Sequence, residues 1–459
     1  MITKLKQIQN HEGFMKYLKN TSWLFGGRIL RIILGLFVGI WLARYLGPEQ
    51  FGNFSYVLSF VGLFTAFATL GLDGIVIREL VKDESRRDEL IGTTFWMKLM
   101  GSFGVLAILG IAVNFTSNDT YTNALVFIIA SATIFQSFNV VDMYFQSKVL
   151  SKYVVYANVI SLFLSSMVKI ALILIEAPLM AFAWVVLFDS FVLASGLVYF
   201  YISFSRSHQT NRNSQLVGES YTHLLKTLKF KKKTAILLLK DSWPIIISGI
   251  ALMVQARIDQ VMLQEMVGSN EVGYYSVALR LIEAFGFLPM LLHRSIFPAL
   301  VNAKKVSEEL YRARFLNYYR LSFLLFLVTA IPILLFSEEI IVLLFGVAYQ
   351  PASILLALMA IRLFFTNTGV ARGSFINIEN LFKFAMITMI FGAVVNVVLN
   401  YYLIPLYQGR GAIVATIVSF TVTGFLIDFL YIKTRKNVTL QLYGILTFYK
   451  INIGNKYER

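Results

Sequence analysis

Two arginines lie inside an apolar stretch near the start of the chain, which reads GGRILRIILGLFVGIW over residues 26–41. Arg28 and Arg31 are three residues apart, so on a helix they share one face. A guanidinium does not lose its proton in proteins. An intramembrane charge is costly unless it faces a partner or a water-filled cavity. Because the arginine fork matches phosphate and carboxylate oxygens, the pair predicts a site for an anionic group.

Other ionisable residues fall within predicted membrane spans. The candidate cationic site is completed by four more arginines, namely Arg78, Arg257, Arg280 and Arg362. The candidates for ion coupling or charge pairing are Asp73, Lys169, Asp259 and Glu283. Arg257 and Asp259 could neutralise Arg280 and Glu283 as structural pairs between helices, and the sequence leaves that reading open. Arg28 and Arg31 have no acid in their own helix, and Asp73 is the only evident distant partner.

Residues for covalent chemistry do not stand out. The chain has no cysteine, and its four histidines lack metal-ligand spacing. No catalytic triad or phosphate-cradling glycine loop is present, so we expect a protein that is not an enzyme and that has no cofactor or metal. The Gly26–Gly27 pair is better explained by close helix packing.

The elements that must position these charges are membrane helices. The chain of 459 residues is 57% hydrophobic and 14% charged, with a mean hydropathy of +0.69. Soluble domains have about 25% charged residues, so the chain is predicted to be an all-α polytopic membrane protein. Taking about 20 residues per span, we predict about twelve helices, at residues 21–46, 52–81, 90–113, 121–147, 152–175, 179–203, 240–266, 272–300, 315–336, 352–377, 382–404 and 411–433.

The net charge of +16 gathers in alternate loops. Lysines and arginines mark the N-terminus, the long segment 204–239 and the start of the tail, whereas the links at 114–120 and 176–180 have none. This alternation places both termini in the cytoplasm. The Lys231–Lys233 run indicates a solvated loop, with contact to anionic lipid headgroups as the alternative. No nucleic-acid-binding motif accompanies the charge, so no nucleic acid is expected.

An internal repeat relates residues 22–58 to residues 242–279. Ser-Trp opens each stretch, Gly47 and Gly52 match Gly268 and Gly273 in spacing, and aromatic residues follow both glycine pairs. A repeat of six helices enters the membrane twice in the same direction, which predicts two lobes related by a pseudo-twofold axis along the membrane normal. The expected divisions are an N-terminal lobe 1–203, a basic cytoplasmic linker 204–239, a C-terminal lobe 240–435 and a cytoplasmic tail 436–459.

Three motifs resemble one family. They are LARYLGPEQFGNFSYVLSF, ARIDQVMLQEMVGSNEVGYYSVALRL and NVVLNYYLIPLYQGRGAIVATIVSF. They are similar to the O-antigen and capsule-type polysaccharide flippases of the multidrug/oligosaccharidyl-lipid/polysaccharide exporter superfamily, and the likeness spans about residues 20 to 433.

The resemblance implies a multi-pass protein of the bacterial cytoplasmic (inner) membrane that moves undecaprenyl-pyrophosphate-linked oligosaccharide to the outer leaflet by alternating access. It implies a basic cavity whose matching residues are Arg28, Arg31, Arg78, Arg257 and Arg280. The implied partners are the lipid-linked oligosaccharide and membrane lipids, with glycan polymerases and glycosyltransferases as further candidates. A proton or sodium gradient is the candidate energy source, and the sequence does not choose between them.

Three alternative functions fit the sequence less well. A drug/cation antiporter of the same superfamily would place an acid in the first helix, where this chain has arginines. A flippase for lipid-linked peptidoglycan precursors usually has two additional helices. A membrane glycosyltransferase or polymerase would need a large loop with acidic or His–Arg clusters, and the longest loop here is rich in lysine.

Overall fold

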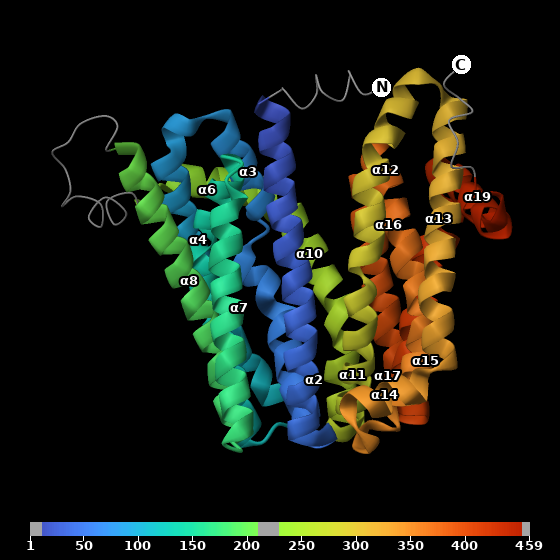
Figure 1. Ribbon diagram of the computed structural model, residues 1–459, viewed down its shortest axis with the longest axis horizontal. Coiled ribbons are helices and arrows are strands. Elements are labelled where there is room, and N and C mark those ends of the chain that lie inside the picture. The colour runs from blue at the N-terminus through green and yellow to red at the C-terminus, as the bar shows by residue number, and fades with distance from the viewer. Residues whose placement is uncertain (1–11, 210–228, 452–459) are drawn as a thin grey trace. The chain divides into compact units, whose positions relative to one another are not determined.

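The computed structural model describes residues 12–209 and 229–451, and every regular element within them is a helix (Figure 1). The predicted all-α class is therefore confirmed. Within these ranges, ten helical stretches are long and apolar enough to cross a membrane. Two of them, Ser22–Lys82 and Phe382–Leu430, each contain two predicted spans. Ten stretches with two counted twice correspond to the twelve predicted helices.

The chain divides into two compact units. The first contains the described residues up to Leu42 and those from Val57 to Met253, and the second contains Ala43–Tyr56 and the described residues from Val254 onward. The two long helices that contribute to both units are α2 (Glu12–Thr69) and α10 (Lys232–Met266).

The other helices belong to one unit each. Those of the first unit are α3 (Asp73–Lys82), α4 (Arg87–Ala112), α5 (Thr120–Phe135), α6 (Val140–Ser147), α7 (Ser151–Leu174) and α8 (Leu179–Gln209). Those of the second unit are α11 (Ser269–Phe285), α12 (Phe287–Val306), α13 (Glu308–Leu335), α14 (Ser337–Phe345), α15 (Ala352–Ala360), α16 (Arg362–Ile378), α17 (Phe382–Thr421), α18 (Ile427–Leu430) and α19 (Ile432–Leu446). A π-helical segment, Val422–Leu426, joins α17 to α18.

Glycine and proline produce the sharp bends inside the long helices. In α2, Gly47 has φ 70° and ψ 174°, and Pro48 follows it. A residue with positive φ breaks the helix, and proline suits the first position of the helix that restarts because it has no N–H to satisfy. In α17 the non-helical residue is Gln408, three residues after Pro405. Pro48 thus lies at a break, and Pro405 lies near one.

Several predicted continuous helices are interrupted, and two of the interruptions involve glycine. The predicted helix 52–81 stops at Thr69 and restarts at Asp73, because Leu70 and Gly71 adopt φ values of 51° and 60°. The predicted helix 272–300 is divided at Gly286 into α11 and α12. Pro289 lies in the first turn of α12, where its missing N–H disturbs the ladder least.

The compact units do not follow the boundaries expected from the sequence. Residues 43–56, expected in the first lobe, lie with the second unit, and residues 240–253, expected in the second lobe, lie with the first. Most of the expected linker, residues 210–228, and residues 452–459 of the tail lie outside the described residues. The expected boundary between lobe and tail, at residue 435, falls inside α19, which packs against α13 (Figure 1).

A close crossing of two backbones explains why residues 43–56 belong to the second unit. A Cβ added to Gly52 would stand 1.8 Å from the carbonyl oxygen of Ser269, and one added to Gly273 would stand 2.1 Å from the carbonyl oxygen of Pro48. The contact is reciprocal, because the repeat aligns Gly52 with Gly273 and Pro48 with Ser269. The Tyr349 hydroxyl adds a hydrogen bond of 2.8 Å to the Ala43 carbonyl oxygen. The pseudo-twofold relation of the whole halves stays a prediction.

Each unit has its own core. In the first, α7 lies beside α8, and the core includes Tyr144, Phe145 and Tyr201. In the second, a core of α12, α13 and α16 residues includes Tyr318, Tyr319 and Phe375. Lipid is as apolar as these side chains, so van der Waals packing and hydrogen bonds, rather than exclusion of water, hold such helices together.

Candidate functional site

The arginine pair of α2 lies in the first unit, where both side chains are exposed. Arg31 donates a hydrogen bond to Oδ1 of Asn158 on α7. Among the described residues, neither Arg28 nor Arg31 takes part in a salt bridge. The helices approach closely here, because a Cβ on Gly27 would stand 2.7 Å from Val155 of α7. That contact gives Gly27 the packing role expected of the pair, whereas a Cβ on Gly26 would meet nothing within 4 Å.

The acid expected as a distant partner of this pair is engaged elsewhere. Asp73, at the start of α3, accepts a hydrogen bond of 2.7 Å from Nζ of Lys98 on α4. The Lys98 side chain is only 2% exposed, whereas that of Asp73 is 61% exposed. The sequence prediction that singled out Asp73 missed Lys98, although a lone lysine in the apolar helix 90–113 was a visible signal.

The other two candidates of the first unit have different surroundings. Arg78 is half-exposed and forms ion pairs of 2.9 Å with both Glu79 and Asp241. Such exposed pairs contribute about 0–1 kcal/mol, so Arg78 is a weaker site candidate than the α2 pair. Lys169 is partly buried on α7, about three turns beyond Asn158.

The second unit gathers three of the predicted charges. Arg257 on α10 pairs with Glu283 on α11 at 3.6 Å. Both of these side chains interact electrostatically with Arg280, whose guanidinium carbon lies 5.3 Å from the centre of the Phe51 ring. A cation over an aromatic face is stabilised without losing its charge. The expected neutralisation is therefore present for Arg257 and Glu283.

Asp259 is not part of an ion pair in the described portion of the chain. It is 3% exposed and accepts three hydrogen bonds, from the Tyr275 hydroxyl at 2.6 Å, Asn400 Nδ2 at 2.7 Å and the Thr416 hydroxyl at 2.6 Å. Neutral donors thus satisfy a carboxylate that the sequence assigned either to coupling or to charge pairing. The neighbouring Asn400 Oδ1 is buried without a hydrogen-bond partner among the described residues.

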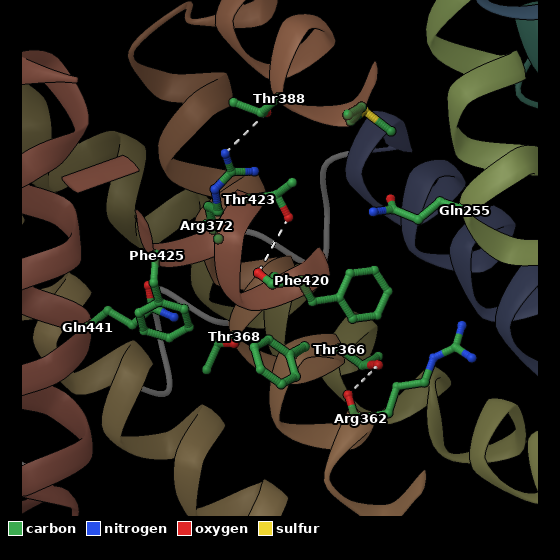
Figure 2. Close-up of a pocket in the computed structure, with 14 residues that line it drawn as sticks. Gln255, Arg362, Thr366, Thr368, Arg372, Thr388, Phe420, Thr423, Phe425 and Gln441 are labelled. Carbon is green, nitrogen blue, oxygen red and sulfur yellow. Dashed lines mark hydrogen bonds between the residues drawn. The ribbon is translucent and has the colours of Figure 1, made fainter. Parts of the chain in front are cut away.

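Arg362 lines a cavity of about 230 Å³ in the second unit. Its guanidinium carbon is 5.7 Å from the centre of the Phe420 ring. Figure 2 shows Arg362 and Gln255 on one side of the cavity and Gln441 with Phe425 on the opposite side. No salt bridge of the described residues includes Arg362.

A second arginine of this cavity was missed by the sequence prediction. Arg372 forms two hydrogen bonds of 2.7 Å with the carboxylate of Asp428, which is 1% exposed. Arg372 and Asp428 lie near the ends of the predicted helices 352–377 and 411–433, so their separation in the sequence hid the pair. Arg372 lines the cavity, and its pairing with Asp428 neutralises the charge that it would otherwise add.

The charges predicted from the sequence therefore form separate groups in the described residues. Arg28 and Arg31 share one face of α2. Arg257, Arg280 and Glu283 are neighbours, and Asp259 and Arg362 both act electrostatically on Tyr275. These groups are polar constellations suited to binding.

Comparison with known proteins identifies the family. The model of the polysaccharide biosynthesis protein family matches residues 17–304. A candidate O-antigen transporter of Shigella flexneri is 26% identical over 91% of this chain and 98% of its own length. The solved structure of an inward-facing multidrug resistance MATE family transporter of the MOP superfamily covers 90% of this chain and 95% of its own, with a TM-score of 0.69 and 15% identity.

The lipid II flippase MurJ, in an inward closed conformation, has a TM-score of 0.65 and 13% identity, covering 94% of this chain and 92% of its own. At these identities the solved structures establish the fold alone. The family model covers more than half of the chain and agrees with the motifs found in the sequence. The chain therefore belongs to the polysaccharide biosynthesis protein family.

Proposed function

We propose that this protein moves undecaprenyl-pyrophosphate-linked oligosaccharide from the cytoplasmic to the outer leaflet of the bacterial cytoplasmic membrane, by alternating access. Both termini and the 204–239 segment are cytoplasmic in this proposal, because of the positive charges in alternate loops. The transported molecule supplies the glycan for surface polysaccharide, so a polymerase and glycosyltransferases are the expected partner enzymes.

The observation that carries the proposal is the pair Arg28 and Arg31. They lie in a stretch long and apolar enough to span a membrane, and their side chains are exposed. Neither forms a salt bridge among the described residues, and the partly buried Asp142 of α6 acts on Arg31 only electrostatically. Charge without a partner at membrane depth is costly, and a diphosphate supplies the missing partner during transport. The fork geometry of arginine matches phosphate oxygens in a bidentate manner.

The test is surface glycan display in a strain that lacks its own flippase. Replacing both Arg28 and Arg31 by alanine should abolish display, whereas lysine at both positions should keep part of it. Lysine retains the charge but loses the fork. Each lost charge-assisted hydrogen bond weakens binding by about 1.5–3 kcal/mol, or about tenfold to a hundredfold. Full display by the double alanine protein, at normal abundance in the membrane, contradicts the proposal.

Asp259 is proposed as the coupling residue for a proton or a sodium ion. The carboxylate and the unpartnered Asn400 Oδ1 together offer the oxygen ligands that a hard cation prefers, and a proton on Asp259 could be donated to the same amide oxygen. Asp259→Asn removes the exchangeable charge and should uncouple transport from the gradient. The coupling is measured as the uptake of labelled sodium, or of protons, by vesicles that contain the protein. If transport by Asp259→Asn depends on the gradient as in the unaltered protein, the assignment is contradicted.

A further inference from the structure

The cavity beside Arg362 has an aromatic and polar lining. A role of Arg362 in binding an anion does not account for this lining. Its apolar walls are Phe365, Phe420 and Phe425, and its polar walls include four threonines and two glutamines. Part of the wall comes from the π-helical segment Val422–Leu426, a form that is rare and frequently found at functional sites. With a volume of about 230 Å³, the cavity is smaller than the typical 300–1,000 Å³ of pockets for drug-sized ligands. It has room for one ring rather than for an oligosaccharide.

The threonine hydroxyls of the lining already use their hydrogen atoms. Thr366 and Thr368 donate to the carbonyl oxygens of Arg362 and Phe364, at 3.1 and 2.7 Å. Thr388 and Thr423 donate to backbone carbonyl oxygens one turn earlier, at 2.9 and 3.0 Å. A hydroxyl that donates once still accepts through its oxygen lone pairs. The threonine oxygens therefore have acceptor capacity left, although that of Thr388 already accepts one hydrogen bond of 3.4 Å from Arg372.

Gln441 supplies the strongest sign of a missing ligand. Its side chain lines the cavity and is 2% exposed, and its Oε1 has no hydrogen-bond partner in the part of the chain that the structure describes. A buried acceptor without a partner costs about 1–3 kcal/mol. A ligand that donates a hydrogen bond removes this cost when it binds.

The net charge of the cavity limits the class of ligand that it can bind. Arg372 is neutralised by Asp428, and Arg362 leaves the cavity with one net positive charge. A cation is disfavoured in this cavity, although the threonine oxygens can accept hydrogen bonds. A ligand with many hydroxyl donors, apolar ring faces for the phenylalanines and no positive charge fits the lining.

We infer that this cavity binds a single sugar ring of the transported glycan. That the sugar belongs to a transported glycan rests on the proposed function, whereas the match to a hydroxyl-rich ring rests on the lining alone. The site is distinct from the diphosphate-binding role of Arg28 and Arg31, because it lies within the second unit.

The experiment measures binding of free monosaccharides to the purified full-length chain in detergent, by saturation-transfer difference NMR. The probes are glucose, galactose, N-acetylglucosamine and glucuronic acid, with inorganic phosphate as a separate probe. Saturable binding of at least one sugar is expected. If no sugar binds, or if phosphate binds and sugars do not, the inference is overturned.

Gln441→Met is the first variant, with Gln350→Met as its control on the exposed surface. Methionine has a similar length but no polar atom at this position. Loss of one hydrogen bond should weaken sugar binding about tenfold. The same change should leave the melting temperature equal or higher, because the unpartnered acceptor is gone. A merely structural glutamine would give the reverse, with lower stability and unchanged affinity, and that result would overturn the inference.

Gly369→Leu is the second variant, because it fills the cavity from α16. Nothing lies within 4 Å of a Cβ added at Gly369 or at Gly373, and only Gly369 lines the cavity. Gly369→Leu should abolish sugar binding while Gly373→Leu keeps it. Equal binding by both proteins contradicts the site. Glycan display by the unaltered chain is measured in parallel, so that a failed sugar site and a failed flippase function give different results.

Discussion

At the scale of single residues, Asp119 shows how a carboxylate outside the membrane spans stabilises a helix. It is the N-cap of α5, and its side chain accepts a hydrogen bond of 2.8 Å from the backbone N–H of Thr122. Hydrogen bonds from the side chain and then the backbone of Thr122 hold the pKa of Asp119 below its ordinary value of 3.8. A lowered pKa in the folded state means stabilisation that is present above the unfolded pKa and lost as the pH falls through the folded value.

We predict that Asp119→Ala lowers the free energy of unfolding by about 1 kcal/mol at neutral pH, because the cap is lost. The difference between the unaltered protein and this variant should shrink as the pH falls below about 4. Asp119→Asn is the matched control, because asparagine caps nearly as well and does not titrate. The measurement is thermal unfolding in detergent across pH. A difference that stays constant with pH rules out this role for the ionised carboxylate.

The second prediction for single residues concerns the ion pair of Arg372 and Asp428. The bidentate pair is buried, with side chains 16% and 1% exposed. Removing one partner leaves an uncompensated buried charge, so Arg372→Met should cost about 3–5 kcal/mol of unfolding free energy. Adding Asp428→Leu should restore much of the loss, since no charge then remains unpaired.

Arg312→Met is the matched control, because Arg312 pairs with Glu308 on the exposed surface at 3.3 Å. It should change the free energy of unfolding by less than about 1 kcal/mol. The effects of Arg372→Met and Arg312→Met are compared by denaturant unfolding of the purified proteins. Equal effects of Arg372→Met and Arg312→Met would mean that water reaches the inner pair.

At the scale of elements, the crossing of α2 and α11 depends on two glycines. A methyl group at Gly52 or at Gly273 would meet backbone oxygen at 1.8 or 2.1 Å, and backbone atoms cannot move aside as a flexible side chain can. The two helices would have to separate. This crossing joins residues 43–56 to the rest of the second unit.

Gly52→Ala and Gly273→Ala are each expected to destabilise the protein by about 1–3 kcal/mol, the usual cost of overpacking. Gly104→Ala is the control, because nothing lies within 4 Å of a Cβ there and alanine favours helix over glycine by about 1 kcal/mol. Melting temperatures in detergent measure the three variants. If Gly52→Ala is as stable as Gly104→Ala, the crossing is not tightly packed.

At the scale of the whole molecule, the loop charges predict the orientation in the membrane. Lys232 lies at the start of α10, next to Lys231 and Lys233, whereas Asn118 lies in a link without lysine or arginine. Positive loops remain on the cytoplasmic side. Single cysteines can be introduced cleanly, because the chain has none of its own.

A membrane-impermeant maleimide added to intact cells should label Asn118→Cys and leave Lys232→Cys unlabelled until the cells are opened. Lys232→Cys labels after lysis as the internal control for accessibility. Labelling of Lys232→Cys from outside, with Asn118→Cys protected, would establish the opposite orientation.

The sequence by itself determined the helical class, the twelve spans and the family motifs, because membrane spans are long apolar runs that are local in the chain. It also located Gly52, Gly273 and the charged residues of the spans. Only the tertiary structure showed which residues these charged side chains pair with or accept hydrogen bonds from: Asp73 with Lys98, Arg372 with Asp428, and Asp259 with Asn400 and Thr416. The cavity beside Gln441 was hidden for the same reason. Side chains from different helices meet through packing geometry, and the sequence of one helix carries no record of which face another helix covers.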